Sequence, residues 1–292
     1  MKRLSKGDRI FLIVVYAIVA LLCVIFIYPL IYILSLSFSS PESVYYGRVT
    51  LLVKDFSLEA YKAIGDKPEI FTGLWNTVKM VVLGTALSLV FTFGLAYPLS
   101  RKDLKGRKVI TTLCVFTMFF SGGLVPLFIV VQALGLYNTL WATILPCSVS
   151  VWNVIVVRTF MSSTIPEDLQ EAARIDGAGD FRIYFQIILP LCKPIIAIMI
   201  LFYGVGYWNS YFYPLVFISP SKTDLKTLQL VMREILLNDG SGSVGEDALE
   251  YKMLSEAVKY SSIVVTTLPI LIVYPFLAKY LEKGMMIGSV KG

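Results

Sequence analysis

The polar residues that could do chemistry gather in one segment, residues 162–178, between two long apolar stretches. Thr164 and Glu167 have the spacing of a capping box, and Pro166 lies in the first turn, where a missing N–H is tolerated. Gly177 has the position of a C-terminal cap. The spacing therefore predicts a helix of about three turns that ends at Gly177.

This predicted helix has a slim apolar face with charged neighbours. Leu169, Ala172 and Ala173 share one face at spacings of three and four, and Glu171 and Arg174 flank it. Such a face suits insertion into a groove of another protein. An interfacial helix lying on lipid stays open as an alternative, although that usually has a wide bulky face with Lys and Arg opposite. A second helix, predicted over residues 181–189, would complete a helix–turn–helix elbow.

The remaining composition argues against enzymatic chemistry. The chain has no His, the commonest metal ligand and the commonest general base at neutral pH. Its four Cys lie in or beside apolar runs without C-x-x-C spacing, which is typical of small buried hydrophobes. Gly240 and Gly245 have P-loop spacing, but Glu246 follows where a Lys is needed. We therefore expect no catalytic residue, no metal and no cofactor bound by this chain.

Six long apolar stretches must position these residues. Hydrophobic residues make up 57% of the 292 and charged residues 16%, against about 45–50% and about 25% in soluble chains. Crossing a bilayer takes about 20 helical residues. The six stretches are residues 11–38, 77–99, 109–131, 139–160, 195–218 and 263–281. Because they are apolar all round, we expect an all-α integral membrane protein with six transmembrane helices, the elbow lying between the fourth and fifth.

Basic residues are concentrated beside one set of span ends. They lie mainly within residues 2–9, 101–108, 158–193 and 279–291. The positive-inside rule places these segments, the elbow and both termini in the cytoplasm. Two longer segments, residues 45–74 and 219–262, are then expected on the outer side.

The elbow residues also carry a resemblance. Glu171-Ala172-Ala173, then Asp176-Gly177-Ala178, and Ile187-Ile188-Leu189-Pro190 further on resemble the signature of permease subunits of binding-protein-dependent ABC importers. Among these, the chain resembles the maltose-type carbohydrate family. Its last residues, 284–292, are similar to a branch that imports oligosaccharides or polysaccharide fragments.

The resemblance implies a function and a set of partners. It implies the transmembrane, non-catalytic subunit of an ATP-driven sugar importer, forming half of the translocation pathway in a prokaryotic inner or plasma membrane. The partners would be a second homologous permease subunit, two ATPase subunits that bind the ATP and Mg²⁺, and an extracellular or periplasmic solute-binding protein. Nucleic acid is not expected. In that family the elbow, residues 164–190 here, is the coupling helix, whose core corresponds to Glu171, Ala172, Ala173, Asp176, Gly177 and Ala178.

Aromatic residues in the fifth apolar stretch are candidates for sugar contacts. Tyr203, Tyr207 and Tyr211 follow a four-residue spacing and so share one face of a helix. Aromatic rings can stack on sugars, and Asn209 can meet hydroxyl groups. The full candidate set is Tyr203, Tyr207, Trp208, Asn209, Tyr211, Trp152 and Asn153. Packing against neighbouring helices and an interfacial aromatic belt stay open as alternatives.

Two further segments are given roles through the resemblance. The outer segment 219–262 is predicted to contain helices at residues 227–237 and 249–260 around a flexible stretch. The tip of that stretch is hypothesised to dock the binding protein through Asn238, Gly240, Gly242 and Gly245. At the C-terminus, Gly284 is predicted to end the last helix. The tail beyond it then either packs on the permease or enters the cleft between the ATPase subunits.

The organisation expected from the sequence has three parts: residues 1–70, an N-terminal helix with its outer loop; residues 71–282, a five-helix permease core; and residues 283–292, a cytoplasmic tail. A secondary, ion-coupled carrier is the alternative function. Such carriers usually need an ionisable or cation-coordinating group within the membrane. The six stretches contain no carboxylate and no His, which argues against proton coupling.

Overall fold

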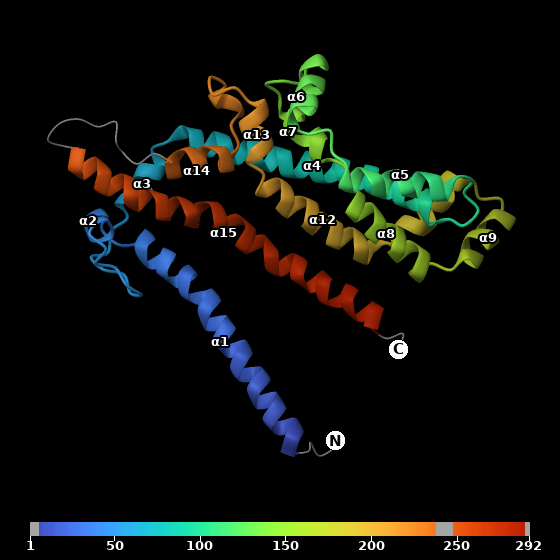
Figure 1. Cartoon of the computed structure of the whole chain (residues 1–292), viewed down its shortest axis with the longest axis horizontal. Helices are drawn as coiled ribbons and strands as arrows, with labels where there is room; N and C mark the ends of the chain where they lie inside the picture. Colours follow the sequence, from blue (N-terminus) through green and yellow to red (C-terminus); the bar gives the residue numbers. More distant parts are fainter. Residues whose placement is uncertain (1–5, 238–247, 290–292) are drawn as a thin grey trace. The chain divides into compact units, whose positions relative to one another are not determined.

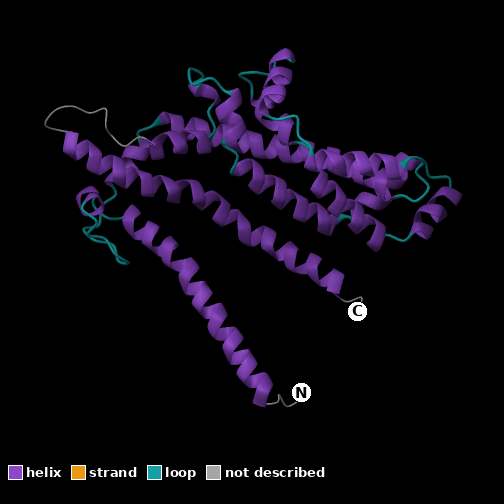
Figure 2. Ribbon diagram, viewed as in Figure 1, coloured by secondary structure: helices purple, strands orange, loops and turns teal. Residues whose placement is uncertain are grey.

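The computed structural model describes residues 6–237 and 248–289. Within them, the regular elements are helices (Figure 2), and Ser39 and Phe56 form one isolated antiparallel bridge. The chain forms two compact units, residues 1–68 with 232–268 and residues 69–231 with 269–292. The division at residues 70 and 282 stays a prediction.

The first unit contains the N-terminal helix α1 (Lys6–Ser37), which is apolar on all sides because its residues are almost all aliphatic or aromatic. Two short helices follow, α2 (Pro41–Tyr45) and α3 (Glu59–Gly65). The unit also includes the end of α14 (Leu228–Leu237) and the first half of α15 (Ala248–Ser289). Hydroxyl groups hold the end of α1: Tyr61 Oη donates to Ser37 Oγ at 2.9 Å, and Ser261 Oγ donates to the Ser37 carbonyl at 3.1 Å.

The second unit is built on α4 (Pro68–Ser100), a helix of 33 residues. The helices that follow in this unit, in chain order, are α5 (Arg107–Phe119), α6 (Leu124–Ala133), α7 (Leu140–Ile144), η1 (Leu145–Cys147), α8 (Val151–Thr164), α9 (Glu167–Ile175), α10 (Asp180–Arg182), η2 (Ile183–Ile188), α11 (Leu189–Leu191), α12 (Lys193–Trp208), α13 (Phe212–Phe217) and η3 (Thr223–Leu225). Of these, Figure 1 labels α5 to α9, α12 and α13. The helices α10, η2 and α11 are continuous, with a π-helical segment in the middle.

The core of this unit lies where α4 meets α12 and α8. The residues that form it are buried side chains from all three helices and from η2, among them Met80, Phe93, Val154, Val157, Ile183, Met199, Tyr203 and Tyr207. Gly84 allows α4 to approach the ring of Tyr207 closely, since a Cβ at that position would lie 2.6 Å from the ring. The close approach fixes the register of α4 against α12.

Three helices among the described residues are long and apolar enough to cross a membrane: Gly7–Ser37, Pro68–Ser100 and Ala248–Val273. Three pairs of helices reach that length only when a bend is included, and the bends measure 111°, 50° and 79°. These pairs are Arg107–Phe119 with Leu124–Ala133, Leu140–Cys147 with Val151–Thr164, and Asp180–Leu191 with Lys193–Trp208. The described residues therefore offer three spans, or up to six if each bent pair counts as one.

Several expectations about helix boundaries are wrong. The stretches 109–131 and 139–160 are each interrupted, the first between α5 and α6 and the second between η1 and α8. The stretch 195–218 is not one helix: α12 ends at Trp208, and α13 starts at Phe212 after a short break. Asn209 and Ser210, which compete with the backbone for hydrogen bonds, occupy this break. Conversely, the predicted helix 249–260 and the sixth stretch form one helix, α15, which continues past Gly284 to Ser289. A glycine in a helix interior costs only about 1 kcal/mol, and Met285 and Met286 directly after it are good helix formers.

The close packing of Gly84 against the ring of Tyr207 leads to a prediction about the stability of the folded chain. Gly84→Ala should lower the free energy of unfolding by about 1–3 kcal/mol, because the new methyl group would overlap the Tyr207 ring and force it to move. Gly94→Ala is the matched control on the same helix. A Cβ there meets none of the described residues within 4 Å, so it should be neutral or stabilise by up to about 1 kcal/mol. Thermal unfolding in lipid nanodiscs checks this. Equal melting temperatures for both variants would contradict the packing.

Candidate functional site

The elbow predicted from the sequence is present, but its first helix starts differently. Thr164 is the last residue of α8, and Pro166 is the N-cap of α9, so the predicted capping box is wrong. A proline disfavours helical backbone in the residue before it, and Ile165 is accordingly extended (φ −105°, ψ 113°). Glu167 and Asp168 still occupy the first turn of α9, where the positive end of the helix dipole favours them.

The end of α9 at Gly177 is as predicted. Gly177 has a φ of +81°, in the left-handed region that side chains other than glycine rarely adopt. The N–H of Ala178 donates to the Ala173 carbonyl at 2.9 Å, and the N–H of Asp176 donates to the Ala172 carbonyl at 3.0 Å. These bonds satisfy the last carbonyls of the helix. The requirement for glycine here comes from the backbone angle and not from crowding, since a Cβ at this position would meet none of the described residues within 4 Å.

The two sides of α9 have different surroundings. Ala173 is buried in the core cluster, and Ala178 is half-buried against it. The remaining residues of the predicted coupling set are exposed: Glu171, Ala172, Asp176 and Gly177. Two large apolar side chains that sequence reasoning missed are also exposed here, Ile175 by 87% and Phe181 by 82%. The place of Ile175 on the same helix face as Ala172 could have been predicted from the sequence, because the two residues are three positions apart.

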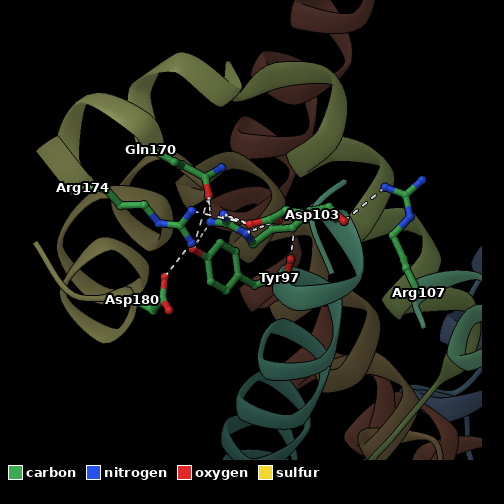
Figure 3. Close-up of polar contacts among 8 residues, drawn as sticks. Tyr97, Asp103, Arg107, Gln170, Arg174 and Asp180 are labelled. Carbon is green, nitrogen blue, oxygen red and sulfur yellow. Dashed lines mark hydrogen bonds and ion pairs between the residues drawn. The ribbon is translucent and has the colours of Figure 1, made fainter. Parts of the chain in front are cut away.

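A cluster of polar side chains holds the inner side of α9 against the loop that follows α4 (Figure 3). This elbow cluster comprises Tyr97, Arg101, Lys102, Asp103, Glu167, Gln170, Arg174 and Asp180. Arg101 donates to Asp103, to Gln170 and to the hydroxyl of Tyr97. Arg174 Nη1 lies 3.5 Å from Asp103 Oδ2, and its Nη2 lies 3.0 Å from Asp180 Oδ1. Lys102 pairs with Glu167 at 3.2 Å.

Asp103 is shared by two guanidinium groups from different parts of the chain. The hydrogen bond from Arg101 lowers the pKa of the Asp103 carboxyl to about 2, with a smaller contribution from Arg174. The same bond raises the pKa of Arg101. Because the carboxyl pKa is depressed from its ordinary 3.8 in the folded chain, the pairing contributes stability above about pH 4. That contribution is lost as the pH falls toward 2.

Further contacts fix the adjoining helices to the end of α4. Arg158 Nε, on α8, donates to the Leu99 carbonyl at 2.9 Å, and Ser162 Oγ donates to the Ser100 carbonyl at 3.2 Å. On the other arm of the elbow, the rings of Tyr97 and Tyr184 lie 5.0 Å apart. Both arms are therefore held by α4. In the sequence, the basic residues of the loop 101–108 predicted only the orientation of the chain in the membrane and not the contacts of this loop with the elbow.

The tyrosines predicted to contact sugar lie inside the helix packing. Tyr203 and Tyr207 are 5% and 3% exposed. The Tyr203 hydroxyl pairs with Thr92 Oγ1 at 2.6 Å, and the Tyr207 hydroxyl pairs with Ser88 Oγ at 3.1 Å. Tyr207 Oη also lies 3.2 Å from the Ile144 carbonyl, to which it donates. These contacts agree with the packing alternative, and a sugar contact by either ring stays a prediction.

The other members of the candidate set are dispersed. Trp208 and Asn153 are buried, whereas Asn209, Tyr211 and Trp152 are exposed. The predicted docking residues Asn238, Gly240, Gly242 and Gly245 lie outside the described residues. Within the described residues, no group of three or more His, Cys, Asp or Glu side chains could hold a metal ion.

Comparison with protein families and curated relatives gives extensive matches. The model of a family described as "Binding-protein-dependent transport system inner membrane component" matches residues 1–287. The chain is 40% identical over 267 residues to Protein LplC of Bacillus subtilis (strain 168), covering 91% of this chain and 90% of LplC. It is 38% identical over 287 residues to the polygalacturonan/rhamnogalacturonan transport system permease protein YtcP of the same organism, covering 98% and 99% of the two chains.

Solved structures also resemble this fold. A chain of a bacterial ABC transporter involved in the import of the acidic polysaccharide alginate superimposes with a TM-score of 0.85 at 32% sequence identity. The match covers 96% of this chain and 99% of that one. A chain of a bacterial alginate ABC transporter in complex with an alginate pentasaccharide-bound periplasmic protein gives a TM-score of 0.57 at 16% identity, covering 94% and 99%. This second match concerns the fold alone.

The elbow cluster predicts that Asp103 restrains α9. Asp103→Asn should accelerate amide hydrogen exchange in residues 167–175 about two- to tenfold, because ion pairs with two arginines are lost and each exposed pair contributes roughly 0.2–1 kcal/mol. Glu171→Gln, at an exposed acid in the middle of α9 outside the cluster, is the control and should leave exchange unchanged. Mass spectrometry of the chain in nanodiscs measures both. Equal exchange in the two variants would show that the cluster does not restrain the helix.

Proposed function

The chain belongs to the family of binding-protein-dependent transport system inner membrane components, and from this premise we propose that it is one of two membrane-spanning subunits of an ATP-driven importer of oligosaccharides or polysaccharide fragments. The observation that carries the proposal is the match of nearly the whole chain to relatives of this kind. YtcP is by name a polygalacturonan/rhamnogalacturonan permease, and the structurally similar transporter imports alginate.

In this proposal the exposed side of α9 is the surface that meets the ATPase. Glu171 makes a charge-assisted contact with a basic residue of the ATPase groove. The small Ala172 side chain allows close approach, and the exposed Ile175 and Phe181 add apolar area to the contact. The buried Ala173 anchors the helix on its other side. Two ATPase subunits bind ATP and Mg²⁺, while this chain performs no catalysis and binds no cofactor.

The proposed topology has six spans and a cytoplasmic elbow. The pairs α5 with α6 and α7–η1 with α8 count as one span each, and residues 195–218 form another, which adds three spans to the three long helices. Both termini and the loop 101–106 lie in the cytoplasm, as the basic residues predict. A second homologous permease subunit completes the pathway, so this chain forms half of it. ATPase closure moves α9 and, through it, the helices that line the path.

The outer side receives the sugar from a solute-binding protein. The bacterial alginate transporter of similar fold is described in complex with a sugar-bound periplasmic protein, which supports such a partner here. The segment 238–245 is proposed to meet this protein. The tail beyond Gly284 is proposed to enter the ATPase cleft. The proposed sugar contacts are those of the full candidate set: Tyr203, Tyr207, Trp208, Asn209, Tyr211, Trp152 and Asn153.

Co-purification tests the proposed assembly. When the chain is affinity-purified from cells that co-express its neighbouring genes, we expect one second permease subunit and two ATPase subunits for each copy of this chain. ATP hydrolysis by this complex should rise when the binding protein is added with one member of a panel of oligosaccharides. The panel contains oligogalacturonates, alginate oligomers and neutral maltooligosaccharides. Isolation of the chain without any ATPase from a preparation that transports sugar would contradict the proposal.

A substitution at Gly177 should uncouple transport. Gly177→Val places a β-branched residue at a φ of +81°, which strains the end of α9 by about 1–3 kcal/mol and misplaces its exposed side. We expect sugar uptake to fall at least about tenfold with normal membrane insertion. Gly179→Val is the matched control, because Gly179 has an ordinary φ of −74° and equally open surroundings among the described residues. Uptake that falls equally in both variants would contradict the role of the Gly177 turn.

Removing the Glu171 carboxylate should weaken ATPase binding. A charge-assisted hydrogen bond contributes about 1.5–3 kcal/mol, so Glu171→Ala should reduce the affinity for the ATPase by about 10- to 100-fold. The measurement is the amount of ATPase retained on immobilised chain as the ATPase concentration is varied. Asp168→Ala removes a different exposed acid of α9 and should retain ATPase as the unchanged chain does. Full retention by Glu171→Ala would place the docking contact elsewhere.

A further inference from the structure

The end of α4 opposite the elbow cluster holds a second remote segment. Asn76 Nδ2 donates to the Asp224 carbonyl at 2.7 Å and to the Lys226 carbonyl at 3.1 Å. One residue further along α4, Thr77 Oγ1 accepts a hydrogen bond of 2.9 Å from the N–H of Leu228. These partners are about 150 residues away in the chain, at the point where α14 starts. We call this group of three hydrogen bonds the α14 latch.

The latch replaces a local helix cap. Leu228 N–H is one of the backbone donors that a helix leaves unsatisfied at its first turn. The neighbouring Thr227 has a side chain that could provide a cap, but its hydroxyl is buried and unpaired among the described residues. Thr77 of α4 accepts the Leu228 N–H instead. The start of α14 is therefore satisfied by another helix rather than by its own sequence.

The latch is also tightly enclosed. Thr77 and Thr227 are fully buried, and Asn76 and Leu228 are nearly so. Gly73, one turn earlier on α4, faces the same backbone, since a Cβ there would lie 3.1 Å from Leu228 N. Breaking the latch would leave buried polar groups without partners, which is costly where water is excluded. Residues 224–228 must therefore follow any movement of α4.

The same helix reaches the elbow without a break. Thr77 and Tyr97 belong to α4 and are 20 residues apart, or about 30 Å at 1.5 Å per residue. Between them, Ser88 and Thr92 pair with the tyrosines of α12. We propose that Asn76 and Thr77 are positioning residues through which the outer segment, when it docks the binding protein, shifts α4 and thereby the elbow cluster. This inference rests on the proposed function and identifies residues through which the two surfaces of the importer communicate.

The test uses the full complex of this chain with its second permease subunit and ATPases in nanodiscs. The binding protein is added together with oligosaccharides from a polygalacturonan digest. If these do not stimulate ATP hydrolysis by the wild-type complex, the member of the sugar panel that does stimulate it is used instead. Asn76→Leu removes two hydrogen bonds and keeps the number and branching of the side-chain heavy atoms, and Thr77→Val removes one. Thr85→Val is the matched control, because it makes the same change on the same helix at a hydroxyl with no partner among the described residues.

We expect complex assembly and basal ATP hydrolysis to be unchanged in all three variants. Stimulation by the loaded binding protein should fall about tenfold in Thr77→Val, as expected for one lost buried hydrogen bond, and at least as much in Asn76→Leu, which loses two. It should persist in Thr85→Val. Wild-type stimulation in both latch variants would overturn the inference while leaving the proposed function intact. Failed assembly of both would also overturn it, because the latch would then serve folding. A wild-type complex that no sugar stimulates would overturn the proposed function itself.

Discussion

Two pairs of buried hydroxyl groups join α4 to α12, and these pairs fix how the second unit packs. Ser88 and Thr92 lie one turn apart on α4, and Tyr207 and Tyr203 lie one turn apart on α12. The two pairs therefore match in only one register of the helices. The free-energy cost of leaving a hydroxyl unpaired in apolar surroundings exceeds the net stabilisation from one hydrogen bond. Sliding of α4 along α12 is therefore opposed at both hydroxyl pairs. Gly84 lets the Tyr207 ring reach this position.

With α4 and α12 fixed, both ends of α4 can hold segments that the chain reaches only much later. At one end Asn76 and Thr77 bind the start of α14, and at the other Tyr97 and Arg101 contact Gln170 of α9. The first contact is enclosed and the second is more exposed and charged. This difference suits a rigid junction at one end and, at the other, a helix whose outer side remains available to a partner.

The sequence predicted those features that depend on local chemistry. Gly177 was expected to end α9, because a glycine after a short amphipathic helix is a local signal, and the structure has the left-handed turn there. The signature around it also indicated the family to which the chain belongs. The capping box failed because the restriction imposed by Pro166 on the preceding residue extends the chain and ends α8 first. The contacts of Asp103 with Arg174 and of Thr77 with Leu228 join residues far apart in the sequence, so no local pattern could show them.

The most direct test of an ATP-driven importer is the energy source of uptake. The purified complex is reconstituted in proteoliposomes, with labelled oligosaccharide and binding protein outside and ATP with Mg²⁺ inside. We expect uptake to require internal ATP and external binding protein, and to persist when ionophores collapse the proton and sodium gradients. Uptake by this chain alone, driven by an ion gradient without ATP, would contradict it and identify a secondary carrier.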